Sequence, residues 1–156
     1  VIFQAQPYNF SERWIQLRKI RMDIPELSLT AVIRCEERNS ALCDEIWNRL
    51  PFDCVQEHGM VSGELIYCWV PLISTAPTPY KLMYTESPIG CVTYSQGTGN
   101  KIIVKYGPCG EDLYAPVLGY VEAEGLKDLA RAGREVWFNY FDDKKIFVVH
   151  FSKEEE

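Results

Sequence analysis

Short apolar segments rich in β-branched and aromatic residues, some of them alternating with polar residues, recur between residues 27 and 151. A period of two, with many β-branched and aromatic residues, is typical of β-strands that bury one face. The pattern predicts about eight short strands, at residues 27–33, 52–57, 64–70, 91–94, 101–106, 117–121, 135–141 and 145–151.

Two segments follow a helical period instead. In residues 41–50, Leu42 and Ile46 lie one turn apart, and Pro51 ends the pattern. Residues 125–131 predict one or two further helical turns. We therefore expect two short helices among the strands.

Glycine and proline separate these elements. Residues 71–90 contain four prolines and predict a surface loop, and residues 107–116 predict another loop. The Gly-Thr-Gly-Asn turn at residues 97–100 predicts a hairpin, and a second hairpin is expected to turn at residues 142–144.

Many short strands with few helices favour a mainly β fold, a closed or nearly closed barrel that leaves no long exposed edge. We expect residues 1–27 to form a lead-in segment and residues 28–156 to form the barrel domain. Side chains fill the interior of a barrel of this size, so a pocket is expected at a mouth or on the wall.

The net charge of the chain and the length of its apolar runs exclude two kinds of binding partner. A formal net charge of −6 argues against a nucleic acid, which requires clustered basic residues. Apolar runs such as residues 146–149 are too short to cross a bilayer, so no membrane partner is expected. Because the chain begins at Val1 without a signal pattern, we expect an excised or processed domain.

Six cysteines are spread along the chain, and no two lie within four residues of each other. This spacing excludes a C-x-x-C zinc or redox motif. Cys68 and Cys91 lie in strand-like apolar runs, where a reduced thiol behaves as a small apolar side chain. We expect free thiols and a reducing, cytoplasmic location.

No phosphate loop, dinucleotide fingerprint or nucleophile elbow is present, so candidate chemistry depends on single residues. His58 lies in a predicted loop and is a candidate base or carboxylate anchor, although a solvated loop histidine is the plainer interpretation. Glu64 opens a strongly apolar strand after Ser62 and Gly63, where desolvation can raise its pKa into a useful range.

Tyrosines and lysines supply the other candidates. Tyr67, Tyr94 and Tyr106 fall on three predicted strands, where each offers a hydrogen-bond donor and an apolar wall, or simply packs. Lys101 and Lys105 share one face of a strand, which is either solvent-exposed or able to present two cations to a dicarboxylate.

Several short segments of the sequence, spread over residues 29–151, resemble a family of small bacterial cyclophilin-like proteins. These segments are residues 44–51, 62–67, 87–94, 102–107 and 125–129. The resemblance implies a cyclophilin-like barrel of about eight strands with two helices, in agreement with the strand count above. It does not imply prolyl isomerase activity, because the arginine-bearing strand and the phenylalanine- and glutamine-rich motifs of true cyclophilins are missing.

Within this fold the chain also resembles the opine synthases that make cucumopine or mikimopine. That group condenses L-histidine with 2-oxoglutarate in a Pictet–Spengler-type ring closure without a redox cofactor. The resemblance implies an amino acid and a 2-oxo acid as substrates, with no cofactor and no metal.

The residues suit this chemistry, which needs a base, an acid and cations that hold carboxylates. Glu64 or His58 is the candidate base, and Tyr94 or Tyr106 is the candidate acid. Lys101, Lys105 and Tyr67 are the candidate substrate-binding residues.

Two other classes of function remain as alternatives. The same pocket can hold a metabolite in a non-catalytic small-molecule-binding module, which needs no titratable pair. A peptide-binding surface would rest on the cyclophilin shape alone. A homodimer also stays open.

Overall fold

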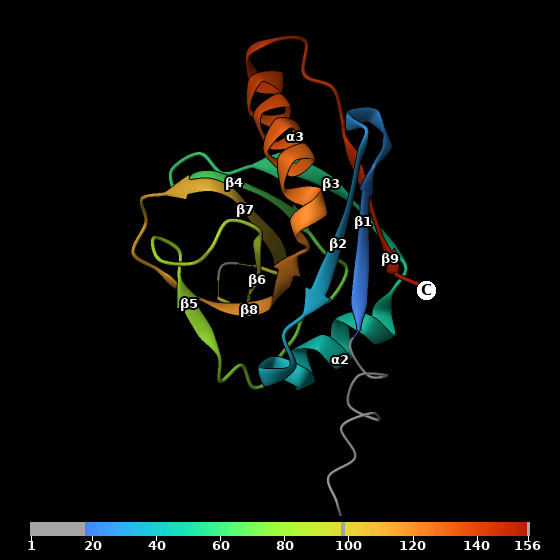
Figure 1. Cartoon of the computed structure of the whole chain (residues 1–156), viewed down its shortest axis with the longest axis vertical. Helices are drawn as coiled ribbons and strands as arrows, with labels where there is room; N and C mark the ends of the chain where they lie inside the picture. Colours follow the sequence, from blue (N-terminus) through green and yellow to red (C-terminus); the bar gives the residue numbers. More distant parts are fainter. Residues whose placement is uncertain (1–17, 98, 156) are drawn as a thin grey trace, which may run out of the picture.

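The computed structural model describes residues 18–97 and 99–155. Eight antiparallel strands form a closed barrel (Figure 1). In their order around the barrel they are β2 (Leu29–Cys35), β1 (Lys19–Ile24), β9 (Val148–Lys153), β3 (Phe52–His58), β4 (Gly63–Trp69), β7 (Lys101–Cys109), β6 (Cys91–Ser95) and β8 (Tyr114–Val121). Pairing of β2 with β8, for example Ile33 with Val121, closes the barrel. This confirms the mainly β, cyclophilin-like barrel.

The alternating pattern fills the barrel as the period of two predicts. In β2, Leu29, Ala31 and Ile33 are buried, whereas Thr30 and Arg34 are exposed. The buried faces of the other strands meet these residues in one continuous core. The interior is therefore packed, and a ligand must bind at an end or on the wall.

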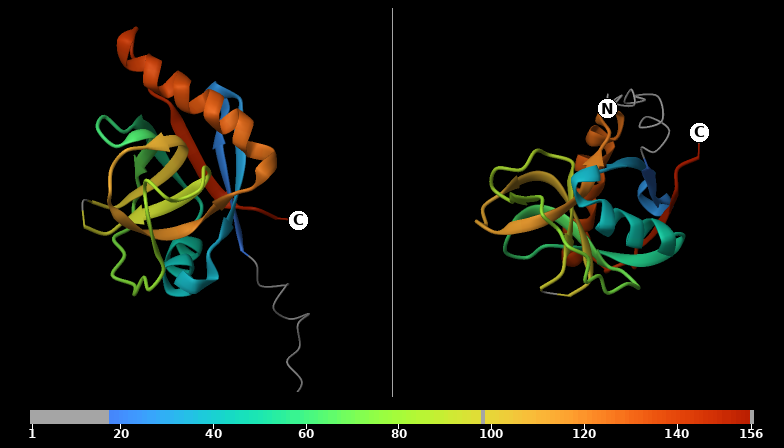
Figure 2. Two further views of the ribbon diagram at one scale, coloured as in Figure 1. Left: turned by 60° about the vertical axis from the view of Figure 1, so that its left-hand side comes forward. Right: turned by 90° about the horizontal axis from the view of Figure 1, so that it is seen from below.

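The two helices lie at opposite ends of the barrel (Figures 1 and 2). Helix α2 (Ser40–Arg49) confirms the first predicted helix and buries Leu42 and Ile46. Helix α3 (Leu126–Phe138) packs against β2, β3, β4 and β7. The end of the barrel beneath α3 is where a site can form between strands and helix.

Helix α3 is longer than the sequence predicted. The strand expected at residues 135–141 is instead the end of α3 followed by a 3-10 turn, Asn139–Phe141. Leu129, Ala132 and Val136 lie three and four residues apart and form the buried face of the helix. Burial of this face outweighs the strand preference of the aromatic residues that follow it.

Other strand and loop boundaries in the structure also differ from the predicted ones. Residues 19–24, which the sequence analysis placed in the lead-in, form β1, because they pair with both β2 and β9. The first 17 residues of the predicted lead-in lie outside the described residues. The expected loop at 107–116 is shorter, since β7 extends to Cys109 and β8 begins at Tyr114.

Short 3-10 turns and one extra strand complete the fold. Strand β5 (Lys81–Met83) lies within the proline-rich segment and pairs with β8 outside the barrel. The 3-10 turns are Pro25–Leu27, Glu37–Asn39 and Ala123–Gly125. All six cysteines are free thiols, as the sequence predicted. Over the described ranges, none of the helices has the length and apolar character needed to span a bilayer.

Candidate functional site

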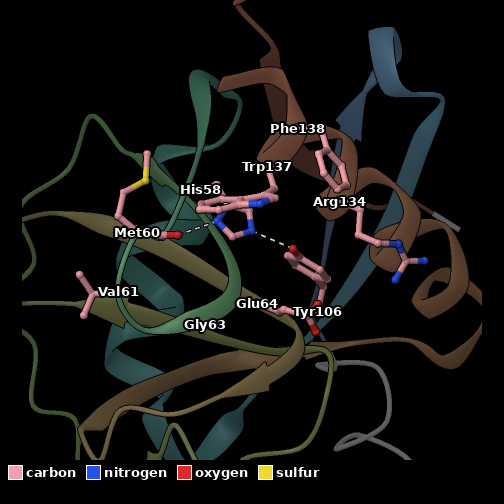
Figure 3. A pocket seen from close by; sticks show the side chains of 10 residues that line it. His58, Met60, Val61, Gly63, Glu64, Tyr106, Arg134, Trp137 and Phe138 are labelled. Atoms are coloured by element: carbon pink, nitrogen blue, oxygen red, sulfur yellow. Dashed lines mark hydrogen bonds between the residues drawn. The ribbon is translucent and has the colours of Figure 1, made fainter. Parts of the chain in front are cut away.

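A cavity of about 400 Å³ opens at the end of the barrel beneath α3 (Figure 3). It lies between the β3–β4 connection, strand β7 and the last turns of α3. Its walls are formed by His58, Gly59, Met60, Val61, Gly63, Glu64, Tyr106, Arg134, Trp137 and Phe138. We refer to it as the mouth cavity. It combines apolar walls with a few polar groups, as small-molecule sites do.

His58 and Tyr106 form a hydrogen-bonded pair in this cavity. His58 is 4% exposed and Tyr106 is 5% exposed. The Nδ1 of His58 lies 2.6 Å from the Gly59 carbonyl oxygen, and its Nε2 lies 2.7 Å from the Tyr106 hydroxyl. A carbonyl can only accept, so Nδ1 carries the proton and Nε2 of the neutral ring accepts from the phenol.

The neutral form of His58 is favoured because burial lowers its pKa below the ordinary 6.5. The Gly59 carbonyl and the Glu64 carboxylate offset this lowering only in part. At neutral pH the imidazole is therefore a base, and its free lone pair is directed at a phenol proton.

Neighbouring side chains hold His58 in place. Its ring lies 4.8 Å from that of Trp137, centroid to centroid. The backbone N–H of His58 donates to the Tyr140 hydroxyl at 2.9 Å, and Tyr140 in turn donates to Glu57. Lys144 completes this chain with an ion pair to Glu57 at 2.9 Å. The imidazole is thus fixed by ring packing and by its backbone.

Glu64 lies beside this pair because of a local irregularity in β4. The register against β7 shifts between Gly63 and Leu65, which frees Glu64 from regular pairing. A Cβ on Gly107 would lie 1.9 Å from Glu64 Oε2, so the carboxylate rests against the bare backbone of β7. Only glycine leaves room for the carboxylate there.

The phenol of Tyr106 is held in its protonated form. Burial raises its pKa to about 12, and the Glu64 carboxylate adds to the increase, while the Arg134 guanidinium opposes it. Gly133 of α3 allows this ring to approach the helix, since a Cβ there would lie 2.4 Å from Tyr106 Cδ1. Glu64 and Tyr106 are thus each seated against a glycine.

Three cavity residues, Arg134, Trp137 and Phe138, come from α3 and were missed in the sequence analysis. Their spacing of three and four residues places them on neighbouring positions of one helix face. The signal was present, but it is readable only once residues 135–138 are known to be helical rather than a strand.

Two of the candidates from the sequence lie elsewhere. The Tyr94 hydroxyl donates to the Leu72 carbonyl at 2.7 Å and accepts from the Ser74 N–H, in the core rather than in the mouth cavity. Lys105 lies on the outer face of the barrel wall, where loop residues bury it. Its Nζ donates to the carbonyls of Tyr84 at 2.5 Å and Ser87 at 2.7 Å. Both side chains are occupied in holding loops.

Tyr67 and Lys101 line a second cavity of about 340 Å³ on the outer wall of the barrel. It shares His58, Gly59 and the following loop with the mouth cavity. The Nζ of Lys101 lies 5.0 Å from the centre of the Tyr67 ring, a cation–π contact. The structure therefore brings His58, Glu64 and Tyr106 together, and it places Tyr67 and Lys101 on the far side of the loop.

The arrangement in the mouth cavity suits proton transfer. A carboxylate and a phenol–imidazole pair face one space that is walled by Trp137 and Phe138 (Figure 3). The carboxylate can accept a proton, and the phenol, oriented by His58, can donate one. Within residues 18–97 and 99–155, no three His, Cys, Asp or Glu side chains gather in a way that could hold a metal ion.

Comparison with family models and with curated proteins yields no match. Among solved structures, McbB in complex with tryptophan is 30% identical in sequence and superposes with a TM-score of 0.80. The match covers 88% of this chain but 45% of McbB, so the chain spans about half of that protein.

A second solved structure is the hypothetical protein AF2241 from Archaeoglobus fulgidus, determined in solution. It is 14% identical, with a TM-score of 0.58 over 88% of this chain and 95% of that protein. At this level of identity the match shows a shared fold only.

Proposed function

We propose that the mouth cavity binds an amino acid with an aromatic side chain and condenses it with a 2-oxo acid. The observation that carries the proposal is the neutral His58–Tyr106 pair next to the Glu64 carboxylate in one cavity at the end of the barrel. Tryptophan in McbB supports an aromatic amino acid as one substrate. The resemblance to the cucumopine and mikimopine synthases supports the condensation and implies no redox cofactor.

The reaction has two stages. The amine adds to the keto carbon, and the resulting carbinolamine loses water to give an imine. A carbon of the aromatic ring then attacks the imine carbon, and the ring carbon loses its proton to restore aromaticity. Each stage needs one base and one acid in close contact with the same substrate atoms.

In our proposal Glu64 is the base that takes the proton from the ammonium group, passes it to the Tyr106 phenolate formed in the same stage, and later takes the proton from the ring carbon. Tyr106 is the acid that protonates the leaving hydroxyl, which departs as water and leaves a protonated imine, and His58 orients the phenol through the 2.7 Å bond. Trp137 and Phe138 form the apolar wall against which the aromatic side chain lies.

The finer assignment follows the opine-synthase resemblance: L-histidine with 2-oxoglutarate, in a Pictet–Spengler-type cyclisation. L-Tryptophan is the natural comparison, because it also carries a nucleophilic ring carbon next to its side-chain methylene. We also propose a reducing, cytoplasmic setting, in keeping with six free thiols.

The test is turnover of L-histidine or L-tryptophan with 2-oxoglutarate, followed by mass spectrometry of the cyclised product. Glu64→Gln preserves the shape of the side chain but removes the basic oxygen, and we expect a rate about 10²–10⁴-fold lower. Glu135→Gln is the matched control, because Glu135 is exposed on the same helix as Arg134 and does not line the cavity. An unchanged rate in Glu64→Gln would assign the base to His58 instead.

A non-catalytic binding module is the second candidate, because the chain matches only 45% of the McbB chain. Such a module would hold the amino acid and leave the bond-forming chemistry to another part of a longer protein. Saturable binding of L-tryptophan or L-histidine without any product, whichever 2-oxo acid is added, would favour it.

A further inference from the structure

We infer that Arg134 binds the α-carboxylate of the amine substrate, so that the mouth cavity selects amino acids over the corresponding decarboxylated amines. The inference rests on the proposed function, since it assigns a specificity-determining residue to the same site. It also replaces the lysine anchors that the sequence suggested.

The charge of the cavity singles out Arg134. Of the described residues that line it, Arg134 is the one with a permanent positive charge, since His58 is held neutral. The structure shows no ion pair for Arg134 within the described ranges, although its neighbour Arg131 pairs with Asp128 and Glu135. A guanidinium that lies at a cavity wall without a carboxylate partner can donate hydrogen bonds to the carboxylate of a ligand.

The position of Arg134 places it next to the reacting groups. Its guanidinium is close enough to Tyr106 to oppose the rise in the pKa of that phenol. Figure 3 shows Arg134 and Phe138 on the α3 side of the cavity, with Tyr106 between Arg134 and His58 in this view. A carboxylate bound to Arg134 would therefore lie beside Tyr106.

The spacing along α3 matches the shape of an aromatic amino acid. Positions three and four residues apart on a helix have Cβ atoms about 5–6 Å apart, close to the separation of a carboxylate from an aromatic ring in such an amino acid. With its carboxylate on Arg134, the substrate can lay its ring against Trp137 or Phe138. Its ammonium group then points across the cavity to the Glu64 carboxylate, which balances the charge.

Neither lysine candidate can replace Arg134. Lys105 is 6% exposed, and its ammonium group is bound by the backbone carbonyls of Tyr84 and Ser87. Lys101 lines the outer cavity, where its Nζ lies 4.6 Å from the centre of the Trp69 ring. Both cations lie on the outer face of the barrel wall, away from Tyr106.

The experiment measures Kd by calorimetry for two pairs of probes that differ only in the carboxylate: L-tryptophan with tryptamine, and L-histidine with histamine. We expect the unmodified chain to bind at least one amino acid about 10–100-fold more tightly than its amine, the usual effect of a charge-assisted hydrogen-bonded pair. Arg134→Gln should remove this preference by weakening the binding of the amino acid while leaving the binding of the amine unchanged. Arg134→Lys should restore part of it, because lysine keeps the charge but not the planar fork.

Arg131→Gln is the matched control, since Arg131 lies one turn away on α3, outside the cavity lining, and should leave all four affinities unchanged. If Arg134→Gln weakens amino acid and amine equally, or neither, the inference is wrong while the proposed function stands. If the unmodified chain binds none of the four probes, the proposed function fails together with the inference.

Discussion

Replacing Gly133 by alanine tests the close contact between α3 and Tyr106. In an ordinary helix interior the change stabilises a protein by about 0.8–1 kcal/mol, because glycine is the poorer helix former. Here the new Cβ would lie 2.4 Å, 2.5 Å and 2.6 Å from Cδ1, Cε1 and Cγ of Tyr106. These atoms belong to the root and the near edge of a buried ring, so they cannot swing away as a flexible side-chain end could.

Overpacking of a buried site costs about 1–3 kcal/mol, and the upper part of that range applies because the ring is also bound to His58. The cost exceeds the gain in helix propensity, so Gly133→Ala should lower the free energy of unfolding by about 1–2 kcal/mol. For a domain of this size the melting temperature should fall by about 2–8 °C. The displaced phenol should also reduce turnover, since its 2.7 Å bond to His58 would be disturbed.

Thermal and urea denaturation followed by circular dichroism measure this change. The contact itself is isolated by repeating Gly133→Ala in a Tyr106→Ala background, where the ring is gone and the substitution should become stabilising. Gly110→Ala is the control, because no atom lies within 4 Å of its added Cβ. A higher melting temperature for Gly133→Ala alone would refute the argument.

Two further predictions concern the His58–Tyr106 pair. Tyr106→Phe leaves the buried Nε2 of His58 without a donor, so the free energy of unfolding should fall by about 1–3 kcal/mol in urea titrations, and an unchanged value would mean that the 2.7 Å bond contributes nothing. Because the pKa of His58 is lowered below 6.5, the unfolded chain takes up a proton first as the pH falls. Stability should therefore be highest above pH 6.5 and decrease below it, and His58→Gln should abolish that part of the decrease in matched unfolding curves.

The fold could be predicted from the sequence to the extent that burial follows a local period. Strand residues 101–106 carry Ile102, Val104 and Tyr106 at every second position, and the helix predicted at 41–50 is ended by Pro51, so residues close in the sequence specify both elements. The sequence also singled out His58, Glu64 and Tyr106, which line the mouth cavity, because each is a titratable residue in or beside an apolar strand. In each of these cases the signal lies within a few residues of the element that it describes.

Only the tertiary structure decided which of the candidates meet. In the sequence, Tyr94 looked equivalent to Tyr106, and Lys105 looked equivalent to Lys101. In the structure the Tyr94 hydroxyl donates to the Leu72 carbonyl. The Lys105 ammonium group donates to the carbonyls of Tyr84 and Ser87. Which face of a strand turns inward depends on closure of the barrel, a pairing between β2 and β8 far apart in the chain. Local periodicity contains no information on that pairing.

The same reason explains why the α3 wall was missed. Val136, Trp137 and Phe138 favour strands by composition, and the burial of Leu129, Ala132 and Val136 against the barrel makes them helical. That burial brings Arg134 to the mouth cavity and Gly133 onto Tyr106. The sequence by itself determined the barrel and its titratable residues, whereas the packing of one helix across the barrel end, a balance of non-local contacts, decided where the mouth cavity lies.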